Sequence, residues 1–193
     1  MTLPIVDGTG KGYMAQVDSN NRLRTQTISD TVYDYQSNEG MAFNVNTEFM
    51  SITSSAETSI FYLQNNTGKD VVLASFFVGT GNAGGTPTEQ GLIRAYFDPT
   101  GVSGGTSVSV VNRRAASATS LQFTGLKHDN STPISATFAS IAPILYQTQG
   151  PSSRVFGTVY LTLPNGKSIL VTYQPNGAQT INIYTGFGGY LVD

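Results

Sequence analysis

Two Pro-Asn-Gly turns in the last third of the chain constrain its fold more than any other feature. They lie at 164–166 and 175–177, and each separates runs rich in β-branched and aromatic residues. Asn-Gly supplies the positive φ angles of a tight turn, while β-branched and aromatic residues favour extended strands. The pattern predicts strands at 155–163, 168–174 and 179–184 that pair in sequence order as a meander.

Upstream segments carry the same signal. Short β-rich or alternating runs predict further strands at 41–49, 58–66, 91–99, 106–114 and 119–127. The run from Val71 to Val78 is apolar apart from Ser75, which is typical of a strand buried on both faces. The segment 131–151 is ambiguous: it accommodates a short helix around Ile134–Ser140, whereas Pro143 prevents a long one. Turn signals at intervals of about ten residues predict an all-β fold, an antiparallel, jelly-roll-like β-sandwich.

The first 30 residues differ from the rest in composition. They are Gly-rich and polar, and their apolar residues are too isolated to close a core of their own. We therefore expect an extended N-terminal arm over 1–30 and one β-sandwich domain over 31–193, which suits a chain of 193 residues. Within the arm, the polar cluster Asp18–Asn21 predicts the turn of a small hairpin, with Val17 before it and Leu23 after it.

The chain carries little charge. Charged residues make up 11% of the sequence and the net charge is −2, so there is no basic excess to neutralise nucleic-acid phosphates. There is no Cys and a single His, which argues against a thiolate or histidine-rich metal site. No apolar run is long enough for a membrane span, and the start has no signal-peptide pattern. We expect no cofactor, no metal ion, no nucleic-acid partner and no membrane partner.

A glycine-and-lysine stretch at 8–12 has the composition of a phosphate-binding loop. A Walker A loop needs Ser or Thr directly after its Gly-Lys pair, but Gly12 follows Lys11 here. The dinucleotide fingerprint fails as well, because Tyr13 stands where its third glycine belongs. No helix is expected after this stretch to hold a phosphate. We interpret it as a turn-forming segment.

No set of residues marks a catalytic site. His128 beside Asp129 would supply two members of a hydrolase triad, yet no Cys and no Gly-x-Ser-x-Gly motif supplies the nucleophile. A solvated pair in a loop is the better interpretation. The carboxylates weighed for glycoside cleavage are Asp30, Asp34, Glu39, Glu48, Glu57, Glu89 and Asp98. The chain has no Trp to line a glycosidase groove and its Tyr residues are dispersed, so we expect a protein that is not an enzyme.

The N-terminal arm carries a pattern of its own. It reads Val-Asp-Gly, a Gly-rich step, Ala-x-Val-Asp, a polar pair and Arg-Leu, with matching positions Val6, Asp7, Gly8, Gly10, Gly12, Ala15, Val17, Asp18, Asn21, Arg22 and Leu23. This stretch resembles a segment common near the N-termini of tailed-bacteriophage virion proteins. The resemblance implies a capsid decoration (cement) protein or a head- or tail-fibre base. It also implies docking on the major capsid protein or another virion protein through Val6, Asp7, Ala15, Val17, Asp18, Asn21, Arg22 and Leu23.

We therefore expect a structural virion protein on the capsid surface rather than the tail, assembled as a homo-oligomer. A homotrimer is favoured because capsid lattices offer local three-fold axes. The alternative is a tail-associated receptor- or glycan-binding module, which an exposed aromatic cluster would indicate. The candidates for that cluster are Tyr33, Tyr35, Tyr184, Phe187 and Tyr190, although the last three are expected to pack in the core or at a subunit interface.

Overall fold

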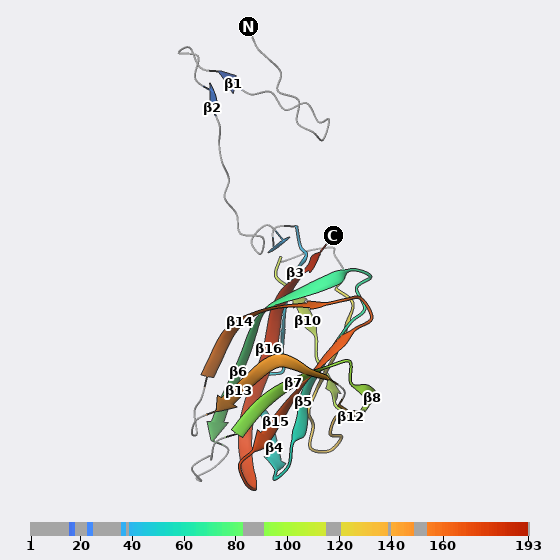
Figure 1. Ribbon diagram of the computed structural model, residues 1–193, viewed down its shortest axis with the longest axis vertical. Coiled ribbons are helices and arrows are strands. Elements are labelled where there is room, and N and C mark those ends of the chain that lie inside the picture. The colour runs from blue at the N-terminus through green and yellow to red at the C-terminus, as the bar shows by residue number, and fades with distance from the viewer. Residues whose placement is uncertain are drawn as a thin grey trace. The chain divides into compact units, whose positions relative to one another are not determined.

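The computed structural model describes residues 16–17, 23–24, 36–37, 39–82, 91–114, 121–138, 140–148 and 154–192. The expected all-β sandwich is confirmed, since nearly all regular structure is strand and antiparallel sheets pack together (Figure 1). The chain divides into two compact units, Met1–Thr31 and Val32–Asp193. Within the described segments, no helix has the length and apolar character needed to cross a membrane.

The first unit contains a small two-stranded sheet. Strand β1 (Gln16–Val17) pairs antiparallel with β2 (Leu23–Arg24), and Val17 lies opposite Leu23. The predicted hairpin is therefore confirmed in its pairing. Its turn at 18–22 lies outside the described residues.

Two six-stranded sheets form the second unit. Sheet I has the order β10 (Val110–Asn112), β3 (Ala42–Asn46), β16 (Gln179–Val192), β6 (Asp70–Asn82) and β14 (Arg154–Leu163), and β4 (Met50–Ser54) also pairs with β16. Sheet II has the order β13 (Ser140–Thr148), β7 (Gly91–Phe97), β15 (Ser168–Pro175), β5 (Thr58–Asn65), β11 (Phe123–Lys127) and β9 (Thr106–Ser107). A separate pair joins β8 (Thr100–Ser103) to β12 (Ser135–Thr137).

The predicted C-terminal meander is wrong, although its three strands exist. Strands β14 and β16 both pair with β6 in sheet I, whereas β15 lies between β5 and β7 in sheet II. The turn after β14 does form, because Lys167 N–H donates to the Pro164 carbonyl at 3.0 Å. It carries the chain from one sheet to the other because Ile169–Val171 is apolar at consecutive positions and is buried on both faces between β5 and β7.

The main core lies between the two sheets. Phe187 of β16 is fully buried, with ring centroids 5.1 Å from Phe76 and 6.0 Å from Phe61. Since Phe61 belongs to sheet II, Phe187 ties the inner faces of the two sheets together. The expectation that Phe187 packs in the core is confirmed.

The outer face of sheet II is covered as well. Ile134 is 5% exposed and packs in one cluster with Tyr62, Tyr96 and Leu170, which lie in a row across β5, β7 and β15. The helix weighed for 134–140 is absent, because Ser135–Thr137 forms β12 and pairs with β8. The extended chain places Ile134 over this sheet, where burial of its apolar surface is favourable.

Strand β6 is buried on one face only, so the prediction that it is doubly buried is wrong. Val71, Leu73, Phe76 and Val78 point into the core, whereas Phe77 is partly exposed. The partly exposed side of β6 belongs to the outer face of sheet I, where no second cluster of buried residues forms among the described residues.

Candidate functional site

Four aromatic rings lie in a continuous row on the outer face of sheet I. Phe156 of β14 stacks on Phe77 of β6 at 5.5 Å between centroids, and Phe77 lies 6.3 Å from Tyr184 of β16. Phe49, in the loop between β3 and β4, meets Tyr184 edge-on at 4.8 Å. We call these four side chains the aromatic strip. Its outer members are largely exposed, Phe156 at 79% and Phe49 at 65%, and Tyr160 of β14 is a further exposed ring outside the strip.

Glycines seat the two inner rings. The register places Gly186 opposite Phe77 and Gly79 opposite Tyr184. A Cβ on Gly186 would overlap the Phe77 ring, and one on Gly79 would overlap the Tyr184 ring. Each ring therefore leans across onto the neighbouring strand and covers glycine backbone, a close approach that any larger residue would block.

The positions next to the centre of the strip carry amides and hydroxyls, whereas exposed apolar side chains such as Val111 and Val192 lie farther out on the face. Asn182 lies opposite Gly81 and Ser51, and Asn46 lies opposite Gly186. On the described part of this face, the register assigns charged side chains only to Arg154 and Asp70, at the ends of their strands. Amides and hydroxyls both donate and accept hydrogen bonds, so the face offers uncharged polar partners beside stacked rings.

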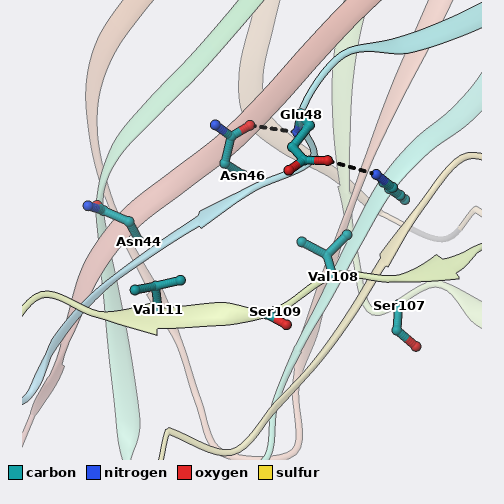
Figure 2. A pocket seen from close by; sticks show the side chains of 8 residues that line it. Asn44, Asn46, Glu48, Ser107, Val108, Ser109 and Val111 are labelled. Carbon is teal, nitrogen blue, oxygen red and sulfur yellow. Dashed lines mark hydrogen bonds and ion pairs between the residues drawn. The ribbon is translucent and has the colours of Figure 1, made fainter. Parts of the chain in front are cut away.

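An open groove of about 420 Å³ adjoins this face where β3 pairs with the edge strand β10 (Figure 2). Asn44 and Asn46 of β3 line one side, and Ser109 and Val111 line the other. Glu48 borders the groove, where its N–H donates to Asn46 Oδ1 at 2.8 Å and its carboxylate lies 3.4 Å from Lys127 Nζ. The groove therefore extends the polar surface with amide and hydroxyl groups, and its one acidic side chain is already paired.

His128 and Asp129 are structural. His128 is 7% exposed, with Nδ1 at 3.1 Å from the Ser59 carbonyl and Nε2 at 3.1 Å from Asn130 Oδ1, so a solvated loop pair is the wrong interpretation for it. Asp129 is half-buried and accepts hydrogen bonds from Ser131 N–H at 2.8 Å and the Thr106 hydroxyl at 3.0 Å, which hold the pKa of its carboxyl below the usual value. Both side chains are engaged in hydrogen bonds that shape the loop.

A polar network on the outer face of sheet II surrounds Glu57. This carboxylate accepts hydrogen bonds from the Tyr96 hydroxyl at 2.9 Å and the Thr172 hydroxyl at 2.5 Å. It also pairs with the Arg94 guanidinium at 3.1 Å, and Arg94 donates to Gln174 at 2.5 Å. Burial, together with the hydrogen bond and negative charge of Glu57, raises the pKa of Tyr96 above 10.0. Each polar side chain of the network has a hydrogen-bond or ion-pair partner, so we interpret the network as structural.

We expect this network to make stability fall at alkaline pH. Because the pKa of Tyr96 is raised in the folded state, the unfolded chain loses that proton first as pH rises through 10.0, and stability drops until Tyr96 also ionises in the native state. Urea unfolding of wild type and Tyr96→Phe between about pH 8 and 11 measures this contribution. Wild type should lose its stability advantage over Tyr96→Phe across that range. Parallel curves for the two proteins would refute the assignment.

The other carboxylates weighed for catalysis do not converge. Glu48, Glu57 and Asp98 each pair with a cation in a different place, the last with Lys167 at 3.0 Å. Glu39 is exposed, whereas Asp30, Asp34 and Glu89 lie outside the described residues. Among the side chains that the structure describes, no three acidic or histidine groups gather as a metal site would require.

The residues predicted to dock on a virion fall mostly beyond the described segments. Val17 and Leu23 face each other in the β1–β2 pair, while Val6, Asp7, Ala15, Asp18, Asn21 and Arg22 lie outside. Of the aromatic candidates, Tyr184 belongs to the strip, Phe187 is in the core and Tyr190 is partly buried. Tyr33 and Tyr35 also lie outside the described residues.

No protein-family model matches the chain, and no curated protein matches it significantly. A fold alone does not define a function, because unrelated functions recur on the same fold.

Proposed function

We propose that the chain is a structural virion protein that decorates or stabilises a bacteriophage capsid as a homo-oligomer, with a trimer favoured. The observation that carries this proposal is the N-terminal pattern Val-Asp-Gly…Ala-x-Val-Asp…Arg-Leu. It lies in a unit separate from the sandwich. This separation suits a protein in which the N-terminal segment docks on the capsid and the β-sandwich projects from it or bridges neighbouring subunits.

The order of the strands supports the same proposal. The connections from β5 to β6 and from β6 to β7 cross from one sheet to the other. The three consecutive connections β13–β14, β14–β15 and β15–β16 cross in the same way. The first and last long strands, β3 and β16, lie side by side. We infer a jelly-roll topology from this arrangement, and jelly rolls recur in viral capsid proteins and in lectins.

Multivalency is the physical mechanism that suits such a component. Each docking contact is weak alone, but an oligomer that closes around a lattice axis engages several contacts at once and raises its effective affinity. A chain with 11% charged residues and a net charge of −2 gains little from long-range electrostatic attraction, so short-range contacts through the arm must provide the specificity.

Deleting residues 1–30 tests the role of the arm. The core lies within Val32–Asp193, so we expect the shortened protein to keep its melting temperature. It should lose co-sedimentation with empty capsids, whereas the full chain pellets with them. Arg22→Ala combined with Leu23→Ala should weaken co-sedimentation in the same direction. Undiminished binding by a folded, shortened protein would show that the arm does not dock.

A further inference from the structure

We propose that the outer face of sheet I binds a neutral glycan chain, with the aromatic strip as its stacking platform. The site goes beyond capsid decoration and does not depend on it. Phe156 and Phe49, at the two ends of the strip, are its most exposed rings, while Phe77 and Tyr184 form a partly exposed middle. Successive centroids lie 4.8–6.3 Å apart, so the rings form one unbroken apolar track.

The seating of the inner rings suits a flat ligand. Phe77 and Tyr184 cover the backbone at Gly186 and Gly79, so the strands present rings lying on the sheet in place of side chains standing up from it. Neither glycine has a positive φ. The Tyr184 ring alone leaves no room for a Cβ at Gly79, whereas at Gly186 the Val45 carbonyl oxygen blocks it together with the Phe77 ring. A pyranose ring has an apolar face of C–H bonds and an equatorial rim of hydroxyls, and rings lying on a sheet offer that face a surface to cover.

The polar groups beside the strip match the rim of such a ligand. Asn182, Asn46 and Ser51 point from the same face, and Thr158 lies opposite Ser75 next to Phe156. Sugar hydroxyls donate and accept hydrogen bonds, as amides and hydroxyls do. The centre of the face lacks the charge that a phosphate, an acidic polysaccharide or a basic peptide would need as a complement.

The exposed apolar area favours a glycan over a second copy of the chain. If a fully exposed Phe presents about 200 Å², Phe156 and Phe49 expose roughly 300 Å² together. A stable protein interface buries about 800 Å² on each partner and has a mostly apolar centre. The strip is a narrow track flanked by hydrogen-bonding groups, and this shape fits an extended chain of sugar units.

Native affinity electrophoresis of the full-length protein tests the proposal. The gels contain dextran, galactomannan or hydroxyethyl cellulose as neutral probes, and alginate as the charged comparison. We expect retardation in at least one neutral gel. Phe156→Ala and Phe49→Ala should each raise the polysaccharide concentration for half-maximal retardation by about tenfold, since loss of a stacking ring typically costs this much affinity.

Matched variants separate binding from folding. Phe138→Ala removes a ring that is 37% exposed but stacks on Tyr96 at the outer face of sheet II, so retardation should stay at the wild-type level. Phe156→Tyr keeps a stacking ring and should also behave as wild type. Phe156 and Phe49 are largely exposed, so their Ala variants should melt within a few degrees of wild type.

Four results would overturn the proposal. The first is no retardation of wild type in any neutral gel, and the second is retardation by alginate alone. The third is equal retardation of wild type and both strip variants. The fourth is dissociation of a wild-type oligomer by Phe156→Ala in sedimentation velocity, which would assign the strip to contact between copies.

Discussion

Replacing Phe187 by Ala should lower the free energy of unfolding by about 3–5 kcal/mol, the range found for large aromatic side chains deleted from a core. The side chain is fully buried and contacts Phe76 on its own sheet and Phe61 on the opposite one. Truncation therefore opens a cavity between the two sheets that neither can close without moving. Thermal and urea unfolding measure the loss.

Phe156→Ala is the matched control for that experiment. It deletes the same side chain from a position that is 79% exposed, so the expected change is below about 1 kcal/mol. Equal losses for the two variants would contradict the assignment of Phe187 to the core and of Phe156 to the surface.

Gly186→Ala should destabilise the fold by about 2–4 kcal/mol despite adding only one methyl group. The new Cβ would overlap the Val45 carbonyl oxygen in the neighbouring strand as well as the Phe77 ring. The ring has freedom to move, but the carbonyl belongs to β3, which is paired with β16 at this point. Relief of the overlap therefore requires the two strands to separate.

Gly81→Ala provides the comparison on the same face. The nearest atoms to a Cβ there lie 3.9 Å away in Asn182, an ordinary van der Waals distance. We expect a change within about 0.5 kcal/mol, because the added methyl group meets no obstacle. The prediction for Gly186 fails if the two alanine variants unfold at the same urea concentration.

Local signals in the sequence predicted the strands well but their partners poorly. Turn chemistry and alternation located β14, β15 and the start of β16 to within a few residues. The meander failed because a Pro-Asn-Gly turn fixes only the local reversal of the chain. Whether the next strand stays in the same sheet depends on burial elsewhere, and the apolar run Ile169–Val171 required the middle of sheet II.

The aromatic strip was only partly visible in the sequence. Phe156 follows Val155 and precedes Val159 and Leu161, so alternation along β14 would have placed this large ring on the outer face. Phe77 is hidden within the apolar run of β6, where Ser75 is the only polar residue from Val71 to Val78 and is too little to reveal the period. Phe49 lies in a loop, and only the folded chain brings it against Tyr184.

The burial of Ile134 against the outer face of sheet II could not be predicted from the sequence for a similar reason. Ile134 lies in a segment of small and polar residues that contains prolines and has no clear hydrophobic period. Its side chain becomes buried only when sheet II has formed beneath it. Long-range packing thus decided the conformation of 134–137, as it often does where local propensity is weak.

Cryo-electron microscopy of assembled particles that contain this chain tests whether it decorates the capsid. We expect sandwich-shaped density on the capsid surface between major-capsid subunits, repeated around local symmetry axes, with the residue 1–30 arm lying against the capsid. Density for this chain found only at the tail tip would contradict this expectation.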